Sequence, residues 1–562
     1  MGKNKHKITS INLDACEVTR FIFGIAVSTY CCILFFAMPL IYHNRYYDIG
    51  SFKYTMFMYI TVSFLLFSTV MSFIYFVVLI VKKHINAESV REFLLSFSVI
   101  DLFVLAFVIA SMLSFILSPN RTAEFPRFFL LTGRAPDHII NLPWEGYKDW
   151  NMGLRSQLMF AAVYFLVSRL FLKSWKWDLI FVMLTSGAAV FLFGILHRFH
   201  IDPLGLYEGL SEYYMLKFLS TLGQSTWYSS YMVLIIPVGM VFFLYSSGKS
   251  HLKKAVLGIF NALSAATFVT QNSDSAYLAF LSSVVIMFAV SFNDNERFLN
   301  FLDLIIIMLS SIKFIGILQI CFPQKASALD SLSFFMSKSA ATWILLILIV
   351  IFRIWISRRM DGGLKIHDFS KVRNVIIAAV IICIPLGVIA GCLNTAGLIP
   401  FEPVKNAEYL NFNDRWGNNR GYTWRNTVEL MGEDTWRSMA LTGPGPDCYP
   451  TVAYATEPRA SELLSFWAGE VVVCCHNEWL NMLFNEGILG FIAYLGIFVS
   501  SFIIFIKKTE DPLMICAAAA VLAYFLHNFF CYQQILCTPI IFCIIALAQW
   551  SGRNPEINGK EQ

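Results

Sequence analysis

Residues 54–81 read YTMFMYITVSFLLFSTVMSFIYFVVLIV, an unbroken apolar stretch without a single charged side chain. A bilayer core of roughly 30 Å is crossed by a helix of about 20 apolar residues. The stretch is therefore long enough to form a transmembrane helix, and it predicts a membrane protein.

Similar runs recur along the whole chain and predict the fold class. Only a few polar residues separate the runs 254–271 and 275–292, and the final pair is also closely spaced. We therefore predict an all-α polytopic integral membrane protein with about 12–14 transmembrane helices. The fourteen candidate spans are 21–42, 54–81, 96–118, 156–173, 178–197, 227–246, 254–271, 275–292, 303–321, 341–356, 374–397, 486–506, 513–530 and 534–550.

The composition excludes several classes of protein. Apolar residues make up 57% of the chain and charged residues only 14%, and the mean hydropathy is +0.63. A soluble globular chain has about 25% charged residues, so an ordinary soluble enzyme, a disordered protein and a nucleic-acid-binding domain are excluded. The 13 Cys are scattered through apolar runs without CxxC pairs, and they indicate small buried side chains instead of a zinc site.

The distribution of Lys and Arg predicts the orientation. With a cytoplasmic N-terminus, basic residues are denser in the inside segments than in the outside ones. Both termini are then cytoplasmic, and the first apolar run is too long for a signal peptide. The chain divides into a transmembrane bundle of about eleven helices, a large extracytoplasmic loop, C-terminal transmembrane helices and a cytoplasmic tail. Their ranges are 1–397, 398–485, 486–550 and 551–562.

The 398–485 loop is where we expect chemistry, because long loops are usually functional. Its stretch NFNDRWGNNRGYTWRNTVELM, residues 411–431, places Arg420 and Arg425 five residues apart, and Arg437 follows. Arginine presents a planar fork of donors that suits phosphate and pyrophosphate. The alternative for Arg425 is an ion pair with Glu429 on a short helix begun by Thr423. The buried face of that helix would carry Trp424, Val428 and Met431.

Two further features lie later in the loop. Gly443 and Gly445 belong to a Gly-Pro-Gly-Pro turn, where glycine permits a close backbone approach, although a plain turn explains it equally well. The stretch HNEWLNMLFNEGILG, residues 476–490, runs directly into a membrane span. On a helix His476 would share a face with Leu480 and Leu483, just above the bilayer. Histidine titrates near neutral pH and accepts protons from hydroxyl groups, but a histidine at this depth is more often structural.

These residues resemble the O-antigen ligase and O-antigen polymerase superfamily. The stretch 476–490 is similar to its HN-x-x-L-x-x-L-x-E-x-G-x-x-G signature. Arg420, Trp424 and the Gly443 to Gly445 turn are similar to the Arg, Trp and Gly-x-Gly residues that precede the signature. The segment Gly223 to Thr226 resembles a further family stretch, with Gln224 where Asn is usual. The resemblance spans roughly 220–505.

The resemblance implies a GT-C-like, metal-independent glycosyltransferase without a cofactor. A glycan would move from a polyprenyl-pyrophosphate donor to an acceptor hydroxyl, with inversion, in the synthesis of a cell-surface polysaccharide. His476 and Arg420 would be catalytic. The substrate-binding residues would be Arg425, Arg437, Asn477, Trp424, Gly443, Gly445 and Gln224. The implied location is the bacterial cytoplasmic membrane, and the acceptor would be a glycan, a lipid or a wall polymer.

One departure from the family leaves other functions open. Asp274 stands where the family usually has an Arg beside the lipid pyrophosphate. A transporter or flippase of lipid-linked glycans is the main alternative, because Lys313 and Asp274 would be ionisable groups within membrane spans. A non-catalytic scaffold is a third hypothesis. The pattern does not separate a ligase from a polymerase, since both need the same donor and base.

Overall fold

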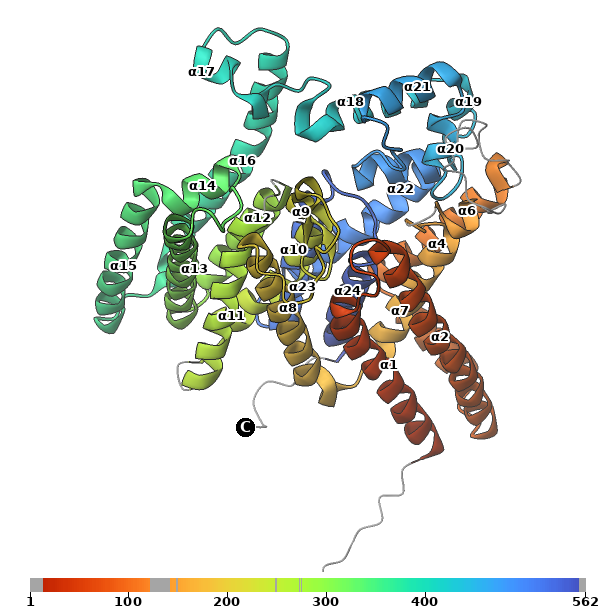
Figure 1. Ribbon diagram of the computed structural model, residues 1–562. Coiled ribbons are helices and arrows are strands. Elements are labelled where there is room, and N and C mark those ends of the chain that lie inside the picture. The colour runs from red at the N-terminus through yellow and green to blue at the C-terminus, as the bar shows by residue number, and fades with distance from the viewer. Residues whose placement is uncertain are drawn as a thin grey trace, which may run out of the picture.

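The computed structural model describes residues 14–121, 142–147, 150–247, 250–271, 273 and 275–554. Within them the regular secondary structure is almost entirely helical, and one two-stranded antiparallel sheet pairs β1 (Phe218–Leu219) with β2 (Gly223–Gln224). Ten of the described helices are long and apolar enough to cross a membrane. The predicted all-α polytopic membrane fold is confirmed, and Figure 1 shows its long helices side by side.

Every one of the fourteen predicted spans contains a helix, although four are shorter than expected. The short ones are α7, α12, α23 and α24, with 16 or 17 residues each. The fourteen helices are α1 (Ala15–Leu40), α2 (Ile49–Val81), α4 (Val99–Leu117), α7 (Leu154–Leu170), α8 (Lys176–Arg198), α10 (Ser225–Leu244), α11 (His251–Thr270), α12 (Ser275–Ser291), α13 (Asn295–Cys321), α15 (Ala340–Asp361), α16 (Ser370–Thr395), α22 (Glu478–Phe505), α23 (Pro512–His527) and α24 (Thr538–Arg553).

Burial divides these helices into a centre and a periphery. In the most apolar 18-residue stretch of α10, 94% is buried inside the protein. The buried share of the corresponding stretch is 11% for α15 and 6% for α16. All three are apolar around their circumference, so the difference is one of position and not of composition. In a bilayer the exposed apolar side chains of α15 and α16 face lipid, which solvates them as well as a protein core would.

Short helices between residues 398 and 485 cover one end of the bundle. In Figure 1 they lie at the upper end, and α1 begins at the opposite, lower end. They are α17 (Glu402–Lys405), η4 (Glu408–Leu410), α18 (Trp416–Met431), α19 (Asp434–Arg437), α20 (Tyr449–Ala453) and α21 (Glu457–Phe466). The remaining short elements are α3 (Ala87–Leu95), η1 (Pro119–Arg121), α6 (Leu142–Glu145), η2 (Lys173–Trp175), α9 (Glu212–Lys217), α14 (Ser331–Lys338) and η3 (Ile366–Phe369).

Helix α22 joins these short helices to the bundle. It begins eight residues before the predicted span 486–506, and its backbone is non-helical at Gly487, with φ 66° and ψ −168°. At this kink Ile488 N donates to Ala440 O at 2.9 Å, and Gly445 N donates to Asn485 O at 3.0 Å. The Gly-Pro-Gly-Pro turn is thereby fastened to the kink through backbone hydrogen bonds.

Lys313, the basis of the transporter alternative, holds two helix ends together. Its Nζ donates to Ser337 O at 3.0 Å, to Ser339 O at 2.8 Å and to Thr342 Oγ1 at 2.7 Å. These carbonyls lie at the C-terminal end of α14, where a cation is favoured by the helix dipole and by unpaired carbonyl groups. The buried lysine thus has a structural explanation, and Asp274 lies outside the described residues.

Candidate functional site

His476 lies just before a helix and not on one, so the predicted helical face shared with Leu480 and Leu483 is wrong. Its φ is +53°, a left-handed conformation that ends the preceding segment. Asn477 is the N-cap of α22, and its Oδ1 accepts from Leu480 N at 3.1 Å. Capping by Asn starts the helix after His476 and leaves the histidine ring free to turn away from the helix axis.

Two aromatic side chains hold the His476 ring. Trp467, the residue after α21, stacks on it with a centroid distance of 5.3 Å and an interplanar angle of 17°. Tyr532 meets its edge at 5.2 Å and 86°. The ring is fixed between segments that are far apart in sequence, and it is only partly buried.

The hydrogen bond of His476 determines which nitrogen is available as a base. Nδ1 lies 3.2 Å from Cys474 O. A carbonyl oxygen only accepts, so Nδ1 carries the proton in this contact and Nε2 keeps its lone pair. Burial, and next the nearby Arg420 guanidinium, lower the pKa of His476 to about 3. The ring is therefore neutral at pH 7, which is the state required of a proton acceptor.

Arg420 lies within electrostatic range of His476 and opens the regular part of α18. Gly417, Asn418 and Asn419 have positive φ, so the helical turns start at Arg420 and not at Thr423. The Arg420 Nε donates to Phe530 O at 3.1 Å and Nη1 donates to Gly417 O at 2.5 Å. These bonds orient the guanidinium toward the segment between α23 and α24.

Gln224 is connected to His476 through Tyr532, which contacts both side chains. The Tyr532 hydroxyl donates to Gln224 Oε1 at 3.1 Å and accepts from Trp227 Nε1 at 2.9 Å. Trp150 packs edge-on against Tyr532 at 4.5 Å. Gln224 is therefore one residue removed from His476, although they are far apart in the chain. The aromatic side chains around them form a wall suited to the apolar faces of sugar rings.

Arg425 has its donors occupied by carboxylates, as the ion-pair alternative predicted. Nε and Nη2 hold the two oxygens of Asp414 at 3.0 and 2.9 Å, and Nη1 lies 2.8 Å from Glu429 Oε1. The guanidinium in turn lowers the pKa of Asp414. Arg437 is exposed on α19 and lies 3.9 Å from Asp434. The His476 contacts described above include neither arginine.

The predicted buried face of α18 is wrong at Val428, whereas Trp424 and Met431 are partly buried. Val428 is 59% exposed, whereas Tyr422, Thr423, Asn426, Thr427 and Leu430 are buried. The face differs because it is set by tertiary contacts, such as that of Trp467 Nε1 with Thr423 Oγ1, which the pattern of α18 alone does not contain. Trp424 is partly buried and stacks on Phe530 at 6.2 Å, and Phe530 is the residue that accepts from Arg420.

Gly443 and Gly445 are buried against the kink of α22. Their φ values are +68° and +123°, in the region that favours glycine. A Cβ on Gly443 would collide with the backbone of Asn485, and one on Gly445 would lie 2.6 Å from Ser118 Oγ. The turn thus makes the close backbone approach that its glycines permit, and the partner of that approach is α22.

Two buried glutamates position the signature stretch. Glu478 accepts from the hydroxyls of Tyr494 and Tyr524, at 2.7 and 3.0 Å, and from the Asn528 side chain. Glu486 accepts from Ser111 Oγ at 2.6 Å and from the Gln157 side chain. Buried carboxylates are tolerated only with such partners, and these bonds fix α22 against α4, α7 and α23.

Sequence reasoning missed Trp467, Phe530 and Tyr532. The last two lie in residues 528–537, which the hydropathy pattern assigned largely to two spans, but α23 ends at His527 and α24 starts at Thr538. Asn528, Gln533 and Gln534 interrupt the apolar run here and were the available signal for a non-helical connection. Such backbone at membrane depth is tolerated where protein buries it.

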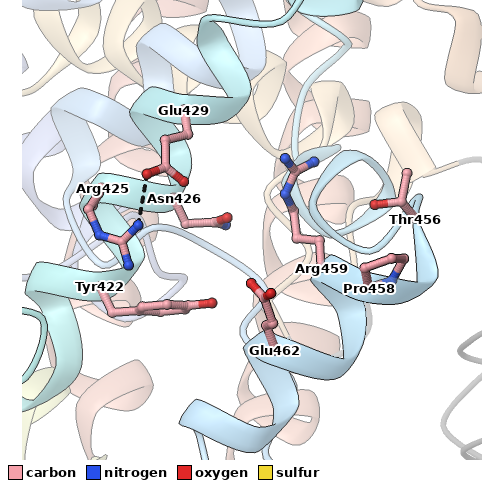
Figure 2. Close-up of a pocket in the computed structure, with 8 residues that line it drawn as sticks. All are labelled: Tyr422, Arg425, Asn426, Glu429, Thr456, Pro458, Arg459 and Glu462. Atoms are coloured by element: carbon pink, nitrogen blue, oxygen red, sulfur yellow. Dashed lines mark hydrogen bonds and ion pairs between the residues drawn. The ribbon is translucent and has the colours of Figure 1, made fainter.

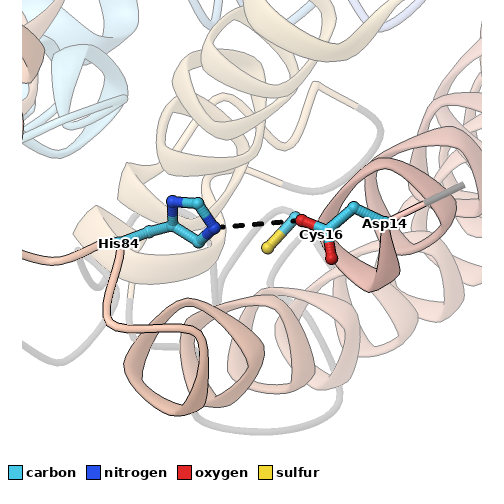
Figure 3. A group of neighbouring side chains, drawn as sticks. All are labelled: Asp14, Cys16 and His84. Carbon is cyan, nitrogen blue, oxygen red and sulfur yellow. Dashed lines mark ion pairs between the residues drawn. The ribbon is translucent and has the colours of Figure 1, made fainter.

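A cluster of potential cation ligands lies at the other end of the molecule. Ligand atoms of Asp14, Cys16 and His84 lie within 4.8 Å of one another (Figure 3). The Asp14 carboxylate already pairs with Lys82 Nζ at 3.1 Å. The three side chains occupy the start of α1 and the residues after α2, at the end of the bundle opposite to the short helices α17 to α21 (Figure 1).

Comparison with known proteins agrees with the resemblance of the sequence. Residues 325–495 match the family model described as O-antigen ligase. No curated protein matches the chain. The matched range contains Arg420 and His476, and it ends within α22, before Tyr532. It supports an O-antigen ligase-like glycosyltransferase role for an integral membrane protein. The match over residues 325–495 supports membership in the O-antigen ligase family.

Proposed function

We propose that this protein transfers a glycan from a polyprenyl-pyrophosphate donor to an acceptor hydroxyl, with His476 as general base. The observation that carries the proposal is the placement of His476 outside α22, with Nδ1 bound to Cys474 O and Arg420 close by. A neutral, oriented imidazole next to a guanidinium supplies a proton acceptor and an anion partner in one place.

The reaction is an inverting substitution. The acceptor oxygen forms a bond to the anomeric carbon of the donor, and the bond between that carbon and the phosphate oxygen breaks. His476 Nε2 receives the proton of the acceptor hydroxyl. The polyprenyl pyrophosphate leaves with the bonding electron pair, and Arg420 stabilises the negative charge that grows on it in the transition state.

The proposed reaction does not require a metal ion. Metal-dependent membrane glycosyltransferases need a pair of acidic residues in the first outer loop to hold the cation. In this chain residues 43–53 contain a single acidic residue, Asp48. Its carboxylate accepts from Asn44 N at 3.0 Å and contacts His43 Nδ1 at 2.8 Å. Arg420 supplies the positive charge that a divalent cation would otherwise provide beside the leaving pyrophosphate.

We place the reaction on the extracytoplasmic side of the bacterial cytoplasmic membrane. The density of Lys and Arg supports this orientation, with α1 starting in the cytoplasm. The short helices α17 to α21 lie at the end of the bundle opposite to the start of α1 (Figure 1). They are thus on the outer side if α1 starts inside.

The pH dependence of transfer follows from the lowered pKa of His476. The general base must be neutral, and its pKa of about 3 predicts that kcat/KM stays level as the pH falls from 7 to about 5. Bound pyrophosphate favours the protonated imidazole, so the acid limb of kcat lies at a higher pH than that of kcat/KM.

Arg420→Gln is expected to raise the pKa of His476, because the variant removes a cation that disfavours protonation. The acid limb of kcat/KM then moves to higher pH, along with a loss of rate. Arg420→Lys keeps the charge and is the matched control, with its limb near that of the wild type. An acid limb near pH 6.5 in the wild type, unmoved by Arg420→Gln, would contradict the role given to Arg420.

A further inference from the structure

A polar cleft between α18 and α21 is used by none of the steps above. Its volume is about 210 Å³, and Figure 2 shows side chains of both helices facing it. The lining residues are Tyr422, Arg425, Asn426 and Glu429 from α18 and Thr456, Pro458, Arg459 and Glu462 from α21 or just before it.

The charges of the cleft argue against a phosphate ligand. Two arginines and two glutamates line it, so its formal charge is balanced. Arg425 is held by Asp414 and Glu429, and Arg459 Nη2 lies 2.5 Å from Glu433 Oε1. An anion would have to displace these carboxylates and approach Glu462. The cleft instead offers donors and acceptors side by side to an uncharged polar ligand.

Asn426 has an unmet donor at the floor of the cleft. The residue is 4% exposed, and its amide nitrogen has no hydrogen-bond partner among the described residues. A buried donor without a partner costs about 1–3 kcal/mol. On the facing helix, the exposed Glu462 carboxylate makes no hydrogen bond or ion pair within the part of the chain that the structure describes. A hydroxylated ligand between the two would satisfy both.

The size of the cleft and its polar lining point to a single sugar residue. Pockets for drug-sized ligands occupy roughly 300–1,000 Å³ and are mostly apolar. This cleft is smaller and its lining is mainly polar. Planar carboxylate, amide and guanidinium groups bind neighbouring hydroxyls of a sugar ring in pairs, as they do other forked partners.

Both walls of the cleft also contact the His476 site. Asn426 follows Arg420 by six residues on α18, which is about 9 Å along a helix axis. On the other wall, α21 leads directly to Trp467, which stacks on His476 and donates to Thr423 Oγ1 at 3.2 Å. A glycan bound at His476 would therefore reach the cleft within one or two sugar residues if it extended along these two helices.

We propose that the cleft between α18 and α21 is a subsite for an uncharged sugar residue of a glycan substrate, lying one or two residues from the bond that forms. This inference rests on the proposed function for its substrate class. The glycan is either the acceptor or the donor, and both present the same neutral hydroxylated ring to Asn426 and Glu462.

Binding of methyl glycosides to the full-length protein in nanodiscs tests the subsite directly. The probes are the methyl glycosides of glucose, galactose, mannose and N-acetylglucosamine, followed by saturation-transfer NMR. At least one should bind to the wild type and to His476→Phe, and its signal should be lost in Glu462→Ala and in Asn426→Ala. Glu470→Ala, which removes an exposed acid of the same loop outside the cleft, should keep it. Absence of binding, or displacement by inorganic pyrophosphate, would overturn the proposal.

Steady-state transfer separates the two sources of the sugar and the two proposals. Glu462→Ala is expected to raise KM roughly tenfold for the substrate that occupies the cleft, equivalent to about 1.4 kcal/mol. A rise for the acceptor or for the donor identifies which one it is. If Glu462→Ala has normal KM values for both the acceptor and the donor and still transfers glycan, the subsite proposal is wrong and the proposed function stands. If the wild type binds a glycoside in the cleft but transfers no glycan, the proposed function is wrong and the subsite proposal stands.

Discussion

His476→Phe is expected to lower the rate of glycan transfer by about 10²- to 10⁴-fold, the usual contribution of a general base. Phenylalanine keeps an aromatic ring between Trp467 and Tyr532 but has no nitrogen to receive a proton. The loss should therefore appear in kcat and leave the amount of folded protein in the membrane unchanged. Initial rates with purified lipid-linked glycan, normalised to folded protein, measure it.

His476→Ala provides the comparison, because it removes the ring and the base together. If packing were the only role of the ring, His476→Phe would retain most of the activity and His476→Ala would lose it. A rate for His476→Phe above roughly a tenth of the wild-type rate would exclude His476 as the base.

Gly487→Ala should have the largest effect on stability. Its φ of 66° and ψ of −168° fall in a region that is essentially restricted to glycine, where strain of about 1–3 kcal/mol is expected. A Cβ would also lie 2.5 Å from Leu441 C and 2.6 Å from Gly443 N, both of them backbone atoms that have little room to move. The Gly443 to Gly445 turn would separate from α22.

Thermal unfolding in detergent and limited proteolysis of residues 398–485 measure this effect. Gly469→Ala is the matched control, because Gly469 also has a positive φ, +85°, but a Cβ added there would meet no described atom within 4 Å. We expect early unfolding and faster cleavage in Gly487→Ala only. Equal unfolding temperatures and cleavage rates for the two variants would show that the contact between α22 and the Gly443 to Gly445 turn does not contribute to stability.

Much of the fold followed from the sequence because lipid imposes a simple rule. A helix that crosses a bilayer has to be apolar over its length, so hydropathy alone located α2 and the other long helices. The rule fails where helices are short and buried in protein. Residues 528–537 are as apolar as a span in places, yet they form an irregular connection because Asn528 and Gln534 bind neighbouring helices.

The candidate site was only partly predictable, for a different reason. The resemblance of residues 476–490 and of Arg420 to the family motifs singled out His476 and Arg420, and the structure places them within electrostatic range. Spacing could not reveal that Asn477 caps α22, which moves His476 off the helical face. Nor could it locate Trp467 and Tyr532, because aromatic contacts between distant segments depend on tertiary packing. The ion pair of Arg425 with Glu429, by contrast, is a local i,i+4 contact, so the sequence already offered it as the alternative to substrate binding.

Reconstitution of the purified protein in proteoliposomes with a labelled polyprenyl-pyrophosphate-linked glycan and an acceptor tests the central claim most directly. We predict covalent transfer of the glycan, release of one polyprenyl pyrophosphate for each bond formed, and loss of both in His476→Phe. Passage of the intact lipid-linked glycan across the bilayer without bond formation would contradict the claim and would establish a transporter.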